Sequence, residues 1–142
     1  MTDLSIPEDF PLSKLVAQEL TQVCIGTHHV RLNFYRLTSP PAGSPPWQPG
    51  AAIDIEAGFE LREAGVAAHT ASNESLGSQA GYLTSLLAQS IAAVDRLPEN
   101  ELLLVFSNGA ELQLFTDSGG YESYHVHIEG QSIDVTAPPR AP

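Results

Sequence analysis

The chain reads Leu15-Val16-Ala17-Gln18, followed by Leu20 and Val23, and 71 residues later it reads Leu86-Leu87-Ala88-Gln89, followed by Ile91 and Val94. Each copy precedes an apolar alternation that is typical of a strand, Val30-x-Leu32-x-Phe34 in the first half and Leu102-x-Leu104-x-Phe106 in the second. The pattern predicts one unit built twice, with half-repeats at about residues 9–63 and 78–135 inside a single domain over residues 1–136. Short apolar patterns also recur by chance, and the sequence does not decide between duplication and coincidence.

A short helix is expected at the start of each half-repeat. Over residues 9–20, one helical face would collect Leu12, Leu15, Val16 and Leu20. In the second half, Ser78 is the expected N-cap of a helix that runs to about Gln89.

Strands are expected over residues 21–25, 30–36, 51–63, 91–95, 101–106, 110–115, 121–129 and 131–135. Residues 51–63 alternate most cleanly, which predicts one long strand with a buried and a wet face, and Gly58 is the place for a bulge or bend. Asn108-Gly109 predicts a type I′ hairpin turn. We therefore expect an α+β fold of mainly antiparallel strands, with two similar half-sheets each preceded by a short helix. Periodicity leaves open a curved sheet or a sandwich.

The charge of the chain limits its partners. Seventeen acidic residues face six basic ones, a formal net charge of −11. Nucleic acids and anionic membranes are bound through Lys and Arg, so we expect neither as a partner, whereas a basic protein would be attracted. Acidity that serves solubility alone is the other interpretation of this charge.

The composition also predicts the cellular compartment of the protein and the nature of its irregular segments. Cys24 is the only cysteine, the N-terminus lacks the pattern of a signal peptide, and no apolar run approaches the roughly 18 residues of a membrane span, so a cytoplasmic protein is expected. The proline-rich residues 39–50 predict an exposed connection, and residues 137–142 a disordered tail.

Several residues are candidates for a binding site. His125 and His127 would project from one face of a strand, about 7 Å apart. Two ligands do not complete a metal site, so we expect no metal and no cofactor. Asp54, Glu56 and Glu60 would line one face of the long strand, as an ordinary wet face or as the footprint of a cationic partner. Trp47, in the proline-rich connection, would cap the core or serve as a binding hot spot.

Signs of catalysis are missing from the sequence. No Gly-x-Ser-x-Gly elbow and no glycine-rich phosphate loop occur, and Cys24 lies between Val23 and Ile25 in an apolar segment. A non-enzymatic protein is therefore expected.

The second half carries a family resemblance. The order of its motifs, with Leu-x-Phe-Ser-Asn-Gly-Ala-x-Leu and Tyr-Glu-Ser-Tyr in it, resembles the uncharacterised bacterial family called domain of unknown function 6188. The residues that carry it are Leu86, Leu87, Ile91, Val94, Leu104, Phe106, Asn108, Gly109, Leu112, Tyr121, Glu122, Ser123 and Tyr124. The resemblance covers residues 15–128 and brings no catalytic residues. It implies an association with the immunity proteins found beside bacterial polymorphic toxins.

Tyr121 and Glu122 belong to this motif. Alternation places the Glu122 carboxylate on the face shared by Tyr124 and Val126, so it needs donors from the backbone or from an arginine. A role in ligand recognition is the alternative.

Three functions follow from the sequence. The leading hypothesis is a small acidic protein-binding module, of the immunity type, that masks a basic partner. The first alternative is a small-molecule-binding or hydrolytic domain that uses a cleft near His125 and His127. The second is a homodimeric scaffold that pairs through the edge strand at residues 131–135. Whether the chain is a monomer or a homodimer stays open.

Overall fold

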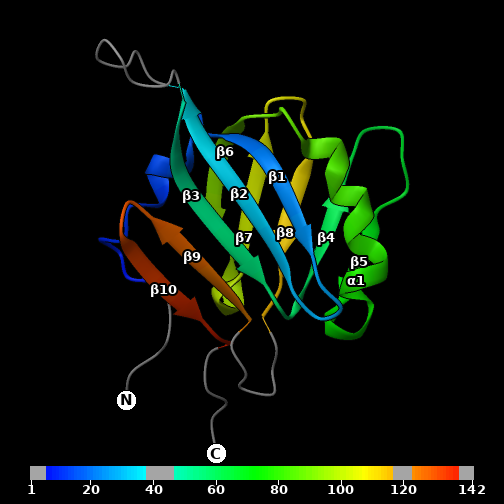
Figure 1. Cartoon of the computed structure of the whole chain (residues 1–142). Helices are drawn as coiled ribbons and strands as arrows, with labels where there is room; N and C mark the ends of the chain where they lie inside the picture. Colours follow the sequence, from blue (N-terminus) through cyan, green and yellow to red (C-terminus); the bar gives the residue numbers. More distant parts are fainter. Residues whose placement is uncertain (1–5, 38–46, 117–122, 138–142) are drawn as a thin grey trace, which may run out of the picture.

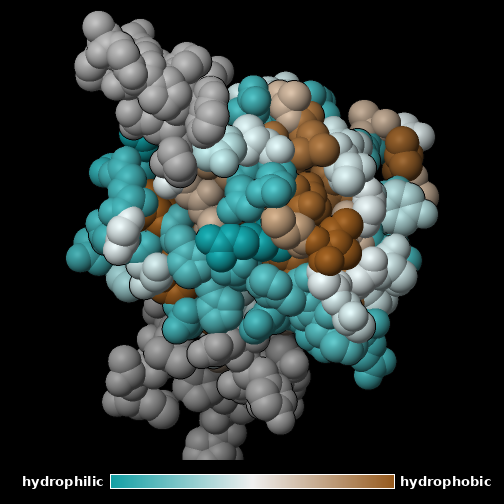
Figure 2. All heavy atoms as spheres, in the orientation of Figure 1, coloured by the Kyte–Doolittle hydropathy of each residue, from teal (hydrophilic) through white to brown (hydrophobic). Residues whose placement is uncertain are grey.

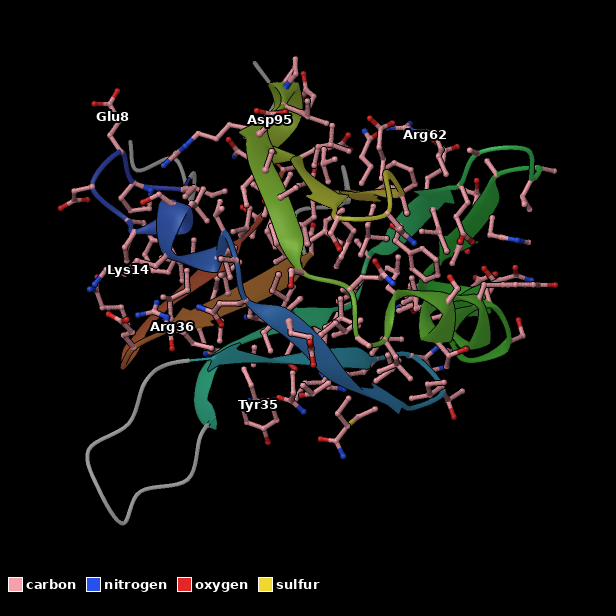
Figure 3. The ribbon with its side chains drawn as sticks, turned by 90° about the horizontal axis from the view of Figure 1, so that it is seen from above. Glu8, Lys14, Tyr35, Arg36, Arg62 and Asp95 are labelled. Atoms are coloured by element: carbon pink, nitrogen blue, oxygen red, sulfur yellow. The ribbon has the colours of Figure 1, made fainter. Side chains whose placement is uncertain are left out.

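Two five-stranded antiparallel sheets pack face to face. The computed structural model describes residues 6–37, 47–116 and 123–137. Sheet A has the strand order β1-β2-β3-β9-β10, and sheet B has the order β5-β4-β8-β7-β6. One hydrophobic core, to which both sheets contribute, lies between them, and the two layers are seen in Figure 1 and from above in Figure 3. The expected α+β fold of mainly antiparallel strands is confirmed, and its form is a sandwich.

The strands of sheet A are β1 (Glu19–Ile25), β2 (Val30–Leu37), β3 (Trp47–Ile55), β9 (Tyr124–Ile128) and β10 (Gln131–Val135). Those of sheet B are β4 (Gly58–Arg62), β5 (His69–Ser72), β6 (Ile91–Arg96), β7 (Leu102–Phe106) and β8 (Glu111–Leu114). Trp47 therefore begins β3, where it pairs with Leu37, instead of lying in the connection before it. The expectation about its side chain lies outside the described part of the structure, as do those about residues 39–46 and 138–142.

The first helical segment is shorter than the sequence predicts, and the second helical region begins and ends earlier than predicted. The helical segments are η1 (Leu12–Leu15), η2 (Asn73–Ser75), α1 (Leu76–Gln79), η3 (Ala80–Leu86) and η4 (Pro98–Asn100). Ala17 and Ala88 have φ of 73° and 68°, which ends the helical path before β1 and β6 begin. The N-cap expected at Ser78 is wrong, because a capping box between Ser72 and Ser75 starts the second helical region earlier. No helix in the described residues is long and apolar enough to cross a membrane.

One topological pattern occurs twice. The meander β1-β2-β3 forms in sheet A and the hairpin β4-β5 then adds to sheet B, whereas β6-β7-β8 forms in sheet B and β9-β10 adds to sheet A. Each sheet thus takes three strands from one half of the chain and two from the other. Neither half can complete a sheet without the other.

The sequence repeat coincides with the place where the halves meet. Glu19 and Ser90 form an isolated antiparallel bridge between the starts of β1 and β6. Matched hydrogen bonds surround it. They are Ala17 N to Ile91 O (2.8 Å), Ala88 N to Leu20 O (2.9 Å), Ile91 N to Gln18 O (2.9 Å) and Leu20 N to Gln89 O (3.0 Å). The first two bonds are equivalent under the repeat, because a shift of 71 residues relates Ala17 to Ala88 and Ile91 to Leu20. The last two bonds are equivalent in the same way.

The expected single strand over residues 51–63 is wrong. β3 ends at Ile55, the chain crosses between the sheets at Glu56 and Ala57, and β4 starts at Gly58. The alternation survives the crossing because both strands turn their apolar residues into the same core. These residues are Ile53, Ile55, Phe59 and Leu61.

Glycine is required at the start of β4. Gly58 has φ of 148°, and a Cβ at this position would lie 2.2 Å from the carbonyl oxygen of Ala71 in β5. The position predicted for a bend is thus where the chain enters the second sheet.

The hairpin at Asn108-Gly109 forms, although not as a type I′ turn. Gly109 has φ of 87°, whereas Asn108 is not among the described residues with positive φ. The Asn108 side-chain oxygen accepts a hydrogen bond from the Ala110 N–H at 3.0 Å, which fixes a different local turn. Two consecutive positive φ values occur instead at Glu99 (65°) and Asn100 (61°), between β6 and β7.

Candidate functional site

The outer face of sheet A brings together polar residues from four strands. Cross-strand pairing aligns Arg31 of β2, Asp54 of β3, His125 of β9 and Asp134 of β10 in one row. These residues project outward because their neighbours along each strand are buried in the core. The strand order, and not sequence proximity, creates this cluster.

Asp54 lies at the centre of the cluster. Its Oδ1 atom accepts a hydrogen bond from His29 Nε2 at 3.0 Å, and its Oδ2 atom accepts one from His127 Nε2 at 2.9 Å and a longer one from Arg31 Nη1 at 3.5 Å. The Asp54 side chain is only 10% exposed. A carboxylate so enclosed needs donors, and this one has them. Asp54 therefore orients its neighbours and is not part of an open acidic surface.

His125 lies between two carboxylates. Its Nδ1 atom bonds to Asp134, and its Nε2 atom lies 3.4 Å from Glu56 Oε2. Burial works against the charged imidazolium, but the hydrogen bonds and charges of Asp134 and Glu56 outweigh burial and raise the pKa of His125 above 6.5. The pair of carboxylates thus favours a protonated ring, which ties β9 to β10 and to the crossing between the sheets.

His127 connects Asp54 to a serine. The Ser132 hydroxyl of β10 lies 2.7 Å from His127 Nδ1, while His127 Nε2 donates to Asp54. Hydroxyl, imidazole and carboxylate therefore follow one another in the order of a nucleophilic triad, with Nδ1 facing the serine. The Nε2–H donated to Asp54 leaves Nδ1 as the acceptor for the hydroxyl proton.

Glu60 lies on the opposite side of the molecule. It projects from the outer face of sheet B, where Arg62 Nη1 donates to it at 2.7 Å and Thr70 donates at 3.3 Å. In Figure 3, Tyr35 marks the outer side of sheet A, and Arg62 and Asp95 lie on the outer side of sheet B. The expectation that Asp54, Glu56 and Glu60 line one face is therefore wrong, because the chain changes sheets between them.

Four carboxylates and one guanidinium share the outer face of sheet B, where the guanidinium of Arg62 bonds to Glu60 and Glu111. We call this surface the acidic face, and it comprises Glu60, Asp95, Glu101, Glu111 and Arg62. Leu103 and Val105 of β7 are half-buried, and they pair across the sheet with Asp95 and Glu111, respectively. The face thus combines an apolar centre with an acidic surround.

The cationic side chains of the described residues are all bound internally. Their contacts are Lys14 to Glu129 (2.6 Å), Arg36 to Glu129 (3.1 Å), Arg31 to Asp54 (3.5 Å), Arg62 to Glu60 (2.7 Å) and Arg96 to the Ile6 carbonyl (2.6 Å). The Lys14 hydrogen bond lowers the pKa of Glu129. The carboxylates in excess of these cations are therefore available to solvent and to binding partners.

On the outer side of sheet A, polar and apolar side chains occupy different areas of the surface. Figure 2 shows hydrophilic side chains over the middle of this sheet and a group of apolar ones beside them, over β1. Ile25, at the end of β1, is 48% exposed, and Leu87 is 38% exposed. In the described part of the chain, no group of three or more His, Cys, Asp or Glu side chains is arranged to hold a metal ion.

Sequence reasoning found part of this cluster. It named Asp54, Glu56, His125 and His127, and the structure brings these four together. Tyr121 and Glu122 lie outside the described residues. It missed the partners Arg31, Ser132 and Asp134. Their alternation predicted an outward direction, but only the register decided which outward residues meet.

Comparisons of the chain with protein-family models, curated proteins and solved structures found no match. The resemblance to domain of unknown function 6188 therefore stays a prediction.

Proposed function

We propose that the protein is a non-enzymatic binding module that recognises a basic protein partner through the acidic face. The carrying observation is that each described Lys and Arg side chain already has a partner within the chain, while among the described residues this face holds four carboxylates and one cation, Arg62, which bonds to two of them. Such a surface attracts a basic partner over roughly a Debye length, about 8–10 Å at physiological salt. A masking role of the immunity type is the form of this function that the family resemblance implies.

The acidic face also offers the rigidity that binding requires. Gln113 and the Thr116 N–H hold the two oxygens of Glu101 at 2.8 Å and 3.3 Å. Arg62 fixes both Glu60 and Glu111. Carboxylates held in place lose little side-chain entropy on binding, which favours affinity. Leu103 and Val105 add apolar area that a partner can bury.

The test compares two triple variants with equal charge changes. One neutralises the acidic face, with Asp95→Asn, Glu101→Gln and Glu111→Gln. The other neutralises carboxylates elsewhere, with Glu8→Gln, Asp9→Asn and Glu19→Gln. Calorimetric titration with an arginine- and lysine-rich peptide, at about 50 and 200 mM salt, measures binding. We expect at least tenfold weaker binding for the first variant only, and a loss of affinity with salt. Equal effects of both variants, or no binding by the wild type, contradict the proposal.

A second candidate function is supported by the Ser132–His127–Asp54 chain of hydrogen bonds. In this function the Ser132 Oγ attacks an ester carbonyl and gives its proton to His127 Nδ1, which passes it to the departing alcohol. Water then hydrolyses the acyl-serine. The distances of 2.7 Å and 2.9 Å favour this sequence of proton transfers.

Hydrolysis of p-nitrophenyl acetate tests the second candidate. Activity of the wild type should fall by at least a hundredfold in Ser132→Ala and in His127→Gln, and should persist in Ser107→Ala, a serine in the turn after β7 that is bonded to Gln89. Trapping with a fluorophosphonate, followed by mass spectrometry, should modify Ser132. Activity that survives Ser132→Ala excludes this function.

A further inference from the structure

A trough of about 340 Å³ crosses the outer face of sheet A. Its floor is formed by the small residues Gly50–Ala52 of β3. Arg31 and Asn33 of β2 line one side, and His127 and Ser132 line the other. The volume lies at the lower end of the range for small-molecule sites. The trough is on the opposite side of the molecule from the acidic face, so a ligand there is independent of the acidic-face function, although the trough shares His127 and Ser132 with the second candidate function.

The second half of the chain fills the equivalent position. Ala52 pairs with Asn33 and His127, and the corresponding residue of sheet B is Glu111, which pairs with Val105 and Arg62. Glu111 extends a carboxylate to Arg62 Nε at 3.2 Å. The fold therefore accepts a long side chain here, and an alanine in sheet A is what leaves space between the neighbouring strands.

The polar groups beside the trough are held in fixed orientations. Arg31 Nε donates to Asn33 Oδ1 at 3.1 Å, and Arg31 Nη1 and His127 Nε2 both point to Asp54. Asp54 lies outside the trough lining. The described contacts of Arg31 involve Nε and Nη1, so Nη2 is without a partner, and the Arg31 side chain is 43% exposed. A guanidinium edge with a free donor matches a carboxylate.

Several of the described cationic side chains lie at or beside the trough. Arg31 lines it directly, and Glu129, at its end, binds both Lys14 and Arg36. Figure 3 shows Lys14 and Arg36 close together at this end. Three of the five described cationic side chains, with two carboxylates, therefore gather around one hollow.

We propose that this trough binds a small hydroxylated carboxylic acid. The carboxylate lies against Arg31, and hydroxyl groups bond to Asn33 and Ser132 across the floor at Ala52. The charge around the trough selects an acid over its neutral analogue, because the guanidinium contributes a charge-assisted hydrogen bond only to the anion.

Glucuronate and glucose are the matched probes for this proposal. Glucuronate added to the ¹⁵N-labelled full chain should shift the amide signals of Ala51, Ala52 and Ser132 and should saturate at millimolar concentration. Glucose should bind at least tenfold more weakly. Absence of saturable shifts with glucuronate, or equal binding of the two sugars, overturns the proposal.

Three variants locate the site. Arg31→Gln should weaken glucuronate binding at least tenfold, and Ala52→Gln, which places a long side chain where Glu111 stands in sheet B, should abolish it. Arg96→Gln makes the same charge change as Arg31→Gln away from the trough and should bind as the wild type does. Because Arg31→Gln also alters the contacts of Asp54, Ala52→Gln keeps the test decisive if Arg31→Gln unfolds. Wild-type affinity in Ala52→Gln refutes the site.

Discussion

Replacing Asp54 by asparagine removes the charge on which the sheet A cluster is centred. Two imidazole donors lie at 3.0 Å and 2.9 Å from its oxygens, and the arginine contact is longer, at 3.5 Å. Hydrogen bonds to charged groups contribute about 1.5–3 kcal/mol when buried, whereas exposed ion pairs contribute about 0.2–1 kcal/mol. Asp54 is enclosed but its partners are not, so we take about 1 kcal/mol for each short bond.

The two short bonds together then contribute about 2 kcal/mol. Asparagine keeps one acceptor oxygen, so Asp54→Asn should cost about 1 kcal/mol and Asp54→Ala about 2 kcal/mol of unfolding free energy. The corresponding loss in melting temperature is about 2–4 °C per kcal/mol for a chain of this size. Urea unfolding, monitored by fluorescence and circular dichroism, measures both variants.

The matched control is Asp134→Asn. This carboxylate also bonds to an imidazole, but its side chain is 57% exposed, so its loss should cost less than about 0.5 kcal/mol. The reasoning is refuted if Asp54→Asn is as stable as the wild type, or if Asp134→Asn costs as much as Asp54→Asn. Either result would mean that enclosure of the carboxylate does not strengthen its bonds.

Three further predictions concern pH and backbone conformation. The raised pKa of His125 means that its stabilising effect is full below pH 6.5 and is lost as pH rises through the folded-state pKa, so the difference in urea midpoint between wild type and His125→Gln should shrink as the pH is raised above 6.5. A constant difference contradicts this. Ala17→Gly and Ala88→Gly should each raise the free energy of unfolding by about 0.5–1 kcal/mol. A left-handed backbone costs alanine about 1–2 kcal/mol, which glycine avoids, but glycine also loses more conformational entropy on folding. Their effects should add in the double variant, and a loss of stability in either refutes the strain. Gly58→Ala should destabilise by more than about 2 kcal/mol, since its Cβ would meet the Ala71 carbonyl oxygen; a thermal melt like that of the wild type would contradict this.

The positive φ angles of Ala17 and Ala88 link the sequence repeat to the fold. Both alanines stand at the third position of the repeated segment, and both precede a strand at the junction of the two halves. Alanine rarely adopts this conformation, so two equivalent cases indicate that the surrounding hydrogen bonds impose it. The repeated sequence therefore marks the joint of the sandwich more than it marks two separate helices.

The sequence determined most of the strands and their inward faces. Alternation in residues 30–36, 102–106 and 124–128 depends only on which side of a strand meets the core, and burial follows it in each case. The same periodicity failed at residues 56–58. Two sheets that share one core accept an uninterrupted alternation across a crossing, so the pattern cannot reveal that the strand has ended.

The candidate sites were decided by tertiary structure. Asp54 and Glu60 look alike in sequence, as outward carboxylates six residues apart. Register gives Asp54 an imidazole and an arginine, and the turn before β2 adds the imidazole of His29; register gives Glu60 an arginine and a threonine on the opposite side of the molecule. Local sequence sets which way a side chain points, because that depends on strand period alone. Which side chains it meets depends on strand order and register, and these are set by the packing of both halves around one core.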